Sequence, residues 1–206
     1  MSAEGLKMVV HTGEASRVGG RLTSDALMDL IGGAGVRASV LLRGAEGFGA
    51  RHRLRTDRLL SLSEDLPLVV VAVDIATRVV PLAAEVQALL PRGLVTLERV
   101  ALPGVQLDDD TASDWTDHEA KLTVYCGRGE EHGGRAVPEA VAEALRHAGL
   151  AGAIVLVGVD GVILGERRRA RVLSRNRGVP AMVIAVGAPE RVARALPAVR
   201  AIAGRH

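Results

Sequence analysis

The sequence predicts an α+β fold of two ferredoxin-like domains in tandem, each with the order βαββαβ except that the second lacks its last strand. The first observation behind this prediction is an internal repeat. The chain of 206 residues matches itself at a shift of 114 residues and, after a one-residue gap, at a shift of 113. The matched positions include Gly19-Gly20-Arg21 with Gly133-Gly134-Arg135, Gly35 with Gly149, and Arg78 with Arg191. A period of this length exceeds that of a solenoid unit, so each copy is expected to form its own domain.

The second observation is a change of composition between the copies. Residues 103–118 combine turn-forming residues with five Asp and no Lys or Arg, which is typical of an acidic linker. We therefore place the first domain at residues 1–102, the linker at 103–118 and the second domain at 119–206. The linker contains Asp108, Asp109 and Asp110 in a row. Three adjacent residues do not converge on one ion in a helix or a strand, so no metal site is predicted.

The third observation is the order of apolar patterns in copy one. Alternating or continuous apolar runs predict strands, and apolar residues at helical spacing predict helices. On these patterns copy one has strands at 6–11, 38–42, 68–73 and 94–100 and helices at 25–33 and 77–90. Ser24 is expected to cap the first helix, and Gly35 to end it. The continuous run 68–73 is expected at the centre of a sheet, with helices on one face and a second sheet or subunit on the other.

Copy two repeats this order as far as its second helix. Its strands are expected at 122–126, 153–157 and 181–186, with one helix that starts near Pro138 and another at 190–203. No counterpart of the strand 94–100 follows. We expect the open sheet position to be filled by copy one, by the linker or by a neighbouring chain, because an unpaired edge favours aggregation.

Composition favours a protein that assembles. One Phe, one Tyr and one Trp leave thin aliphatic cores, which pairing of domains or subunits would stabilise. No apolar run reaches the roughly 18 residues of a membrane span and no signal-peptide pattern is present, so a cytoplasmic protein without membrane insertion is expected. Cys126 is expected to be a buried thiol and has no recognisable spacing to His118 or His147. No catalytic residues are therefore predicted.

The loop between the second and third strands of copy one, residues 43–67, is the most informative segment. It is long for a domain of this size, which indicates a function. Glycines in its first part let the backbone approach an anion, and the arginines that follow supply charge for phosphates: Gly44, Gly47, Gly49, Arg51, Arg53, Arg55 and Arg58. The same residues also fit a glycine-turned hairpin with solvated arginines. The motif alone leaves both interpretations open.

The segment Arg43-Gly44-Ala45-Glu46-Gly47-Phe48-Gly49, followed later by Leu62-Ser63-Glu64-Asp65-Leu66-Pro67, resembles the domain-of-unknown-function family 190 of the PII-like superfamily. Gly47-Phe48-Gly49 is also similar to the start of the mobile T-loop of PII nitrogen-signalling proteins. The resemblance covers residues 6–100 well and residues 121–203 more weakly. Copy two has Gly161-Val162-Ile163 in place of Gly47-Phe48-Gly49.

The resemblance implies a non-enzymatic regulatory protein that assembles as a trimer. A small anionic ligand, with ATP or ADP as the candidate, would bind in the cleft between subunits, and loop 43–67 would contact a target such as a membrane transporter or channel. The chain departs from PII proteins where Pro91-Arg92-Gly93 replaces a longer glycine-rich loop. The candidate ligand-binding residues are Gly44, Gly47, Phe48, Gly49, Arg51, Arg53 and Arg99.

Copy two instead concentrates arginines in its corresponding loop. They are Arg167, Arg168, Arg169, Arg171, Arg175 and Arg177, of which the first four are the candidates for binding a partner or an anion. Such a cluster forms salt bridges within the protein, for example with the acidic linker, or binds an anionic ligand or partner. Nucleic acid is disfavoured because almost no aromatic side chains are available to stack bases. Two functions stay open: a PII-like sensor, and a ligand-free oligomeric scaffold that docks through residues 167–177.

Overall fold

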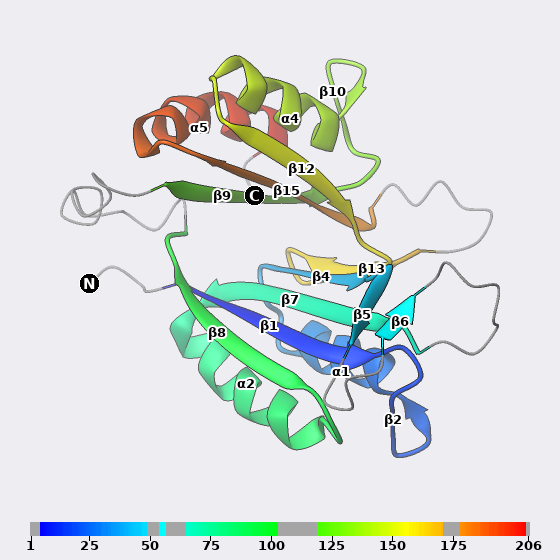
Figure 1. The fold of residues 1–206 in the computed structure, drawn as a ribbon. Helices are drawn as coiled ribbons and strands as arrows, with labels where there is room; N and C mark the ends of the chain where they lie inside the picture. Colours follow the sequence, from blue (N-terminus) through cyan, green and yellow to red (C-terminus); the bar gives the residue numbers. More distant parts are fainter. Residues whose placement is uncertain (1–4, 49–53, 57–64, 103–118, 171–177, 205–206) are drawn as a thin grey trace.

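The computed structural model describes residues 5–48, 54–56, 65–102, 119–170 and 178–204. In both copies a sheet carries two helices on one face, and the other faces of the two sheets pack against each other (Figure 1). The layers therefore run helices, sheet, sheet, helices. The predicted α+β class with two ferredoxin-like units is confirmed.

Copy one builds the larger sheet. Its elements are β1 (Gly5–Gly13), β2 (Arg17–Val18), β3 (Arg21–Leu22), α1 (Thr23–Gly33), β4 (Ala38–Arg43), β5 (Glu46–Phe48), β6 (Leu54–Thr56), β7 (Pro67–Ile75), α2 (Ala76–Leu89) and β8 (Leu94–Val100). Strands β4, β7, β1 and β8 lie side by side in that order and are antiparallel, which is the ferredoxin-like arrangement. The continuously apolar β7 lies in the interior of this sheet, as its sequence predicts.

Copy two builds a smaller sheet. Its elements are β9 (Ala120–Gly127), β10 (Glu131–His132), β11 (Arg135–Ala136), α4 (Val137–His147), β12 (Gly152–Val157), β13 (Asp160–Ile163), β14 (Glu166–Arg169), β15 (Pro180–Gly187) and α5 (Pro189–Ala203). The sheet has three described strands, in the order β12, β15, β9, and no described strand follows α5. In the described part of the chain copy one supplies no strand to the outer edge of β9. The linker lies outside the described residues.

One hairpin crosses from copy two to copy one, which the sequence did not predict. β13 pairs with β4, so the sheet of copy one gains two strands and has the order β14, β13, β4, β7, β1, β8. We expected copy one, the linker or a neighbouring chain to complete the sheet of copy two. Among the described strands copy one does not do so, and copy two instead adds a hairpin to the sheet of copy one.

Hydrogen bonds that recur in both copies confirm the repeat register. The Gly44 amide donates to the Pro67 carbonyl at 2.8 Å, and the Gly158 amide donates to the Pro180 carbonyl at 3.0 Å. Two arginines also correspond, because Arg78 donates to the carbonyl of Gly35 and Arg191 to the carbonyl of Gly149. The shifts of 114 and 113 residues therefore relate equivalent places in the two folds.

Three apolar clusters hold the four layers together. Alternate residues of β1 face α1 and α2, and the equivalent face of β9 and β15 packs on α4 and α5. The third cluster lies between the sheets, where Val40, Val71 and Met182 are buried. Aliphatic side chains fill these cores, as the near absence of aromatic residues predicts. Burial between the copies adds to each thin core.

The predicted cap of the first helix is wrong. Helix α1 has Leu22 at its N-cap position without a side-chain hydrogen bond, and Ser24 is buried inside the first turn. The preceding hairpin satisfies this end of the helix instead, because the Thr23 amide donates to the Ser16 carbonyl at 2.8 Å. Copy two makes the equivalent hydrogen bond, from the Val137 amide to the Glu130 carbonyl. A contact from outside the helix has replaced the local cap.

Candidate functional site at the two loop bases

Loop 43–67 of copy one leaves the sheet at a base that a backbone hydrogen bond holds closed. The loop begins where β4 ends at Arg43 and returns at Pro67, which accepts the hydrogen bond from the Gly44 amide. A Cβ on Gly44 would lie 2.8 Å from Cγ of Pro67, so this close approach requires glycine. Gly44 therefore has a structural role at the base of the loop.

The C-terminal end of the loop is hydrogen-bonded to the turn that follows β1. The Glu14 amide donates to the Leu66 carbonyl at 2.8 Å, and the Ala15 amide donates to Oδ1 of Asp65 at 2.6 Å. The guanidinium of Arg43 contacts the carboxylate of Glu14 at 3.1 Å. These contacts give the Asp65-Leu66 part of the sequence motif a structural role, since it anchors the loop.

The structure brings only part of the predicted ligand site together. Gly44 lies at the loop base, and Gly47 and Phe48 lie in β5, which pairs with β6 and with no other described strand. Arg99 is exposed on β8, and β7 and β1 separate that strand from β4. Within one chain Arg99 and Gly44 therefore lie on opposite edge strands of the ferredoxin-like unit. Three further candidates lie outside the described residues: Gly49, Arg51 and Arg53.

The equivalent loop of copy two forms the hairpin that adds to copy one. Val162 lies opposite Ser39, and its amide donates to Oγ of Ser39 at 3.1 Å. The side chain of Val162 is fully buried in the core of copy one. A Cβ on Gly161 would collide with the Ser39 carbonyl oxygen, so the hairpin requires glycine where it approaches β4. This part of the copy-two loop belongs to the framework of copy one.

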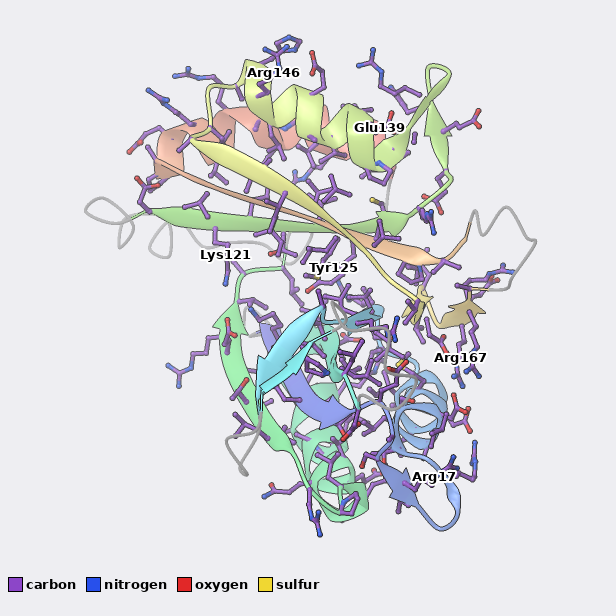
Figure 2. The ribbon with its side chains drawn as sticks, turned by 45° about the vertical axis from the view of Figure 1, so that its right-hand side comes forward. Arg17, Lys121, Tyr125, Glu139, Arg146 and Arg167 are labelled. Carbon is purple, nitrogen blue, oxygen red and sulfur yellow. The ribbon has the colours of Figure 1, made fainter. Side chains whose placement is uncertain are left out.

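Arginines of this hairpin pair with carboxylates from both copies. Arg167 donates to the two oxygens of Asp160 at 3.1 and 2.6 Å and also contacts Asp29 on α1 (Figure 2). Arg169 contacts Asp25 on α1 at 3.0 Å. Asp160 is only 2% exposed, and the two-pronged contact with Arg167 compensates for the burial of its charge. Sequence reasoning missed all three acidic partners.

The ion pairs favour the charged forms of Arg167 and Asp29. The hydrogen bond with Asp160 raises the pKa of Arg167, and the hydrogen bond from Arg21 lowers the pKa of Asp29. Arginine and aspartate charges balance in this cluster, as the salt-bridge interpretation of the arginines predicts. Anion binding by these residues stays a prediction. Arg168 is exposed and contacts Glu166, and Arg171 lies outside the described residues.

A second polar contact joins the copies beside β8. Lys7 and Lys121 occupy the same position of the repeat, and their Nζ atoms lie 2.5 and 3.8 Å from one carboxylate oxygen of Glu98. The hydrogen bond from Lys7 lowers the pKa of Glu98. Burial, together with the negative charge of Glu98, raises the pKa of Tyr125, which lies between the two sheets (Figure 2). Tyr125 is therefore neutral at physiological pH.

Cys126 is a core residue. It is 1% exposed among the apolar side chains of copy two, which confirms the predicted buried thiol. Burial and the nearby Glu130 raise the pKa of this thiol to about 12, so it stays protonated and unreactive at neutral pH. In the residues that the structure describes, no three His, Cys, Asp or Glu side chains are grouped so as to hold a metal ion.

None of the described helices combines the length and apolar character needed to cross a bilayer.

Comparison with known families matches each copy separately. The model of the family DUF190, described as "Uncharacterized ACR, COG1993", matches residues 5–102 and again residues 119–205. Each match contains the strands and helices of one copy, and the second match includes the hairpin β13–β14 that joins the sheet of copy one.

Solved structures are similar to the chain at low identity. CPII, a nitrogen regulatory PII-like protein from Thiomonas intermedia K12 in a structure bound to ADP, AMP and bicarbonate, is 20% identical, with 47% of this chain and 86% of that chain covered and a TM-score of 0.37. The regulatory subunit of aspartate kinase from Thermus thermophilus, in its ligand-free form, is 13% identical, with 97% and 93% covered and a TM-score of 0.39. Both scores are low, and the fold and site described above rest on the geometry of this chain.

Proposed function

The chain belongs to the DUF190 family and carries its domain twice, and from this premise we propose that it is a non-enzymatic regulatory protein of the PII-like kind. It binds a small anionic ligand, with ATP or ADP as the first candidates, in clefts between subunits of a homo-oligomer. Loop 43–67 contacts a target protein. The resemblance in sequence makes a trimer the expected assembly and a membrane transporter or channel the expected target. The cytoplasm stays the expected location.

The contrast between the two loops carries this proposal. The copy-two loop contributes a hairpin that is paired with β4, buried at Val162 and held by ion pairs. The copy-one loop keeps the Gly47-Phe48-Gly49 motif, and its short hairpin joins no described sheet. Among the described residues of the copy-one loop, Gly44 and Asp65 hold its base in place. A loop held at its base and not built into the framework is available for a ligand or a target.

Charge supports an anionic ligand at the copy-one loop. Arginines follow the motif at Arg51, Arg53, Arg55 and Arg58. Guanidinium groups bind phosphates and carboxylates in paired hydrogen bonds, and the neighbouring glycines let backbone amides approach the same ligand. Because Gly44 and Arg99 lie on opposite edge strands of one unit, a site that uses both must combine two subunits.

A thermal-shift panel tests the proposal directly. Wild-type protein is heated with ATP, ADP, AMP, cyclic nucleotides, phosphate or bicarbonate. A ligand at one hundred times its dissociation constant stabilises by about 2.7 kcal/mol, which for a chain of this size raises Tm by roughly 5–10 °C. The double variant Arg51→Ala/Arg53→Ala is expected to lose this response, because it removes two guanidinium groups from the loop.

The matched control is Arg194→Ala on α5 of copy two. Arg194 is exposed and is not one of the candidate binding residues, so the variant should respond to the ligand like wild type. A flat panel for wild-type protein would overturn the ligand proposal and favour a ligand-free scaffold. A response that Arg51→Ala/Arg53→Ala retains would exclude the copy-one loop as the binding site.

A further inference from the structure

Strands β4 and β12 occupy the same place in their respective sheets. β4 pairs with β7 as β12 pairs with β15, and the two registers equate Ala38–Arg43 with Gly152–Val157. The second edge of β4 is covered by β13. The second edge of β12 pairs with no strand in the part of the chain that the structure describes.

The two strands also differ in burial, because residues of β4 are covered both by the hairpin β13–β14 and by the packing of the two sheets. Val40 is fully buried and Leu41 is 7% exposed in β4, whereas Ile154, Val155 and Val157 of β12 are 56%, 40% and 46% exposed. β12 is thus an apolar strand with a free edge. Such an edge is open to strand addition, in which another chain supplies the missing backbone partners.

Copy one holds a hairpin with the same pairing as the hairpin that covers β4. Phe48 lies opposite Leu54 across β5 and β6, as Val162 lies opposite Arg167 across β13 and β14. The hairpin β13–β14 is used inside the chain. The hairpin β5–β6 has no further strand partner among the described residues, and neither has the second edge of β12. The described part of each chain therefore offers one unpaired hairpin and one unpaired strand edge, which are the repeat equivalents of β13–β14 and β4.

A shared glycine indicates that both hairpins can approach a strand in the same way. Gly161 approaches β4 so closely that a Cβ would collide with the Ser39 carbonyl oxygen. Gly47 takes the same position in the repeat and immediately precedes Phe48. The copy-one hairpin therefore has a glycine at the one place where a side chain would prevent strand addition.

The chemistry of the free edge also matches the free hairpin. Where β4 offers the Ser39 hydroxyl, β12 has Ala153. Where α1 offers Asp29 to Arg167, α4 has Glu143, which is already paired with Arg146 at 2.7 Å. The free edge of copy two is thus more apolar than the occupied edge of copy one. The free hairpin is more apolar as well, because it has Leu54 in the position of Arg167.

The direction of the contact inside the chain points to a second chain as the partner. If a two-fold axis related the copies, the hairpin β5–β6 would lie on β12 whenever β13–β14 lies on β4. Only the second contact exists, so the association is head-to-tail. A head-to-tail contact within the chain leaves the hairpin β5–β6 and the edge of β12 unused. Two such complementary surfaces can join neighbouring molecules.

We propose that the β5–β6 hairpin of one chain adds to the β12 edge of a second copy of this chain, in the register that β13 adopts on β4. Glu46 then lies opposite Val155, Gly47 opposite Ile154 and Phe48 opposite Ala153. The addition extends the three-stranded sheet of the partner copy to five strands and buries its apolar edge. This assembly surface requires no ligand.

Cysteine cross-linking between differently tagged chains tests this contact. Glu46→Cys and Val155→Cys are placed on separate chains, co-expressed and mildly oxidised. Directly opposed residues of antiparallel strands have Cα atoms about 4.5–5.5 Å apart, within reach of a disulfide. A disulfide-linked heterodimer is expected on a non-reducing gel. The native Cys126 is buried and does not contribute.

The matched control pairs Glu46→Cys with Leu97→Cys, an exposed residue of β8 that should give no linked product. Absence of the 46–155 link between chains whose circular dichroism is native would overturn the proposal. A link that forms only within one chain, in a Glu46→Cys/Val155→Cys double variant, would also overturn it. The cross-linking experiment contains no ligand, so a missing cross-link would overturn the assembly contact and not the proposed ligand binding. A flat thermal-shift panel would overturn the proposed ligand binding and not the assembly contact.

Light scattering gives an independent measurement of the same surface. Gly47→Val adds a side chain where the hairpin approaches β12, and it is expected to weaken association at least tenfold while circular dichroism stays native. A wild-type protein that is monomeric at high micromolar concentration, or a Gly47→Val protein with undiminished association, would contradict the proposal.

Discussion

Copy one and copy two share a framework and differ most in the loop between the second and third strands of their own sheets. In copy two this loop contributes a hairpin that lies in the sheet of copy one, with Val162 buried and Asp160 paired to Arg167. In copy one the hairpin stands apart from the described sheets and keeps the family motif. The two copies of one ancestral loop therefore differ in structural role, because the described hairpin of copy two is part of a sheet of the other copy and the described hairpin of copy one is not.

The difference also explains why the two sheets depend on each other unequally. Copy one receives two strands from copy two, whereas copy two receives none that the structure describes. The edge of β4 is therefore covered by β13, whereas the second edge of β12 pairs with no strand among the described residues. Substitutions at equivalent positions of the two loops should consequently act on different properties, stability for copy two and association or binding for copy one.

The largest effect is expected for Arg167→Ala. Its removal leaves Asp160 buried without its main partner, and breaking a buried ion pair in this way costs about 3 kcal/mol or more. Chemical denaturation measures the free energy of unfolding. The neighbouring Arg168→Ala removes an exposed side chain and should change that free energy by less than about 0.5 kcal/mol. Equal losses for the two variants would contradict the distinction between them.

A smaller but still clear effect is expected for Gly161→Ala. The added methyl group meets the backbone of β4 and the ring of Pro180, and overpacking of this kind costs about 2 kcal/mol. The equivalent change Gly47→Ala should leave the unfolding free energy of dilute protein unchanged and weaken only association. Urea denaturation at low protein concentration separates the two results. A destabilised Gly47→Ala chain would show that its hairpin is built into the chain's own framework.

The smallest effect is expected at the contact of Lys7 with Glu98, and it depends on pH. The pKa of Glu98 is lowered in the folded protein, so the unfolded chain binds a proton more readily, and stability falls as the pH drops through and below the ordinary Glu value of 4.5. Lys7→Met should make this acid-side loss shallower, by less than about 1 kcal/mol because Glu98 is partly exposed. Urea denaturation at several pH values between about 3 and 6 measures how the free energy of unfolding depends on pH. Lys121→Met, whose ammonium group is farther from Glu98, should change the slope less.

Much of the framework could be predicted because its signals are local. Strand β8 spans Leu94–Val100 as its apolar pattern predicts, and helix α5 differs from its prediction by one residue at the start. The repeat register aligned glycines and arginines that do make equivalent hydrogen bonds, such as Arg78 and Arg191. The predicted Ser24 cap of α1 was wrong because the group that caps this helix is not local to it. The Ser16 carbonyl, which precedes the β2–β3 hairpin, accepts the hydrogen bond from the first turn.

The hairpin between the copies could not be predicted from local patterns. Val162 and its partner Ser39 are 123 positions apart, and a four-residue strand beside a run of arginines resembles a solvated loop. Two of the acids that receive those arginines, Asp25 and Asp29, are spaced four apart on a predicted helix. That spacing shows that they share a helix face, but it does not show what faces them.

The sequence by itself determined two ferredoxin-like units, the missing last strand, the aliphatic cores and the loop that carries the family motif, because periodicity, composition and repetition are written along the chain. Only the tertiary structure decided that Arg167 and Arg169 pair with aspartates, that Val162 fills the core of copy one, and that the second edge of β12 pairs with no described strand. The physical reason is that strand pairing and ion pairing are completed by residues far away in the sequence. An apolar or charge pattern within one segment does not identify the distant segment that pairs with it.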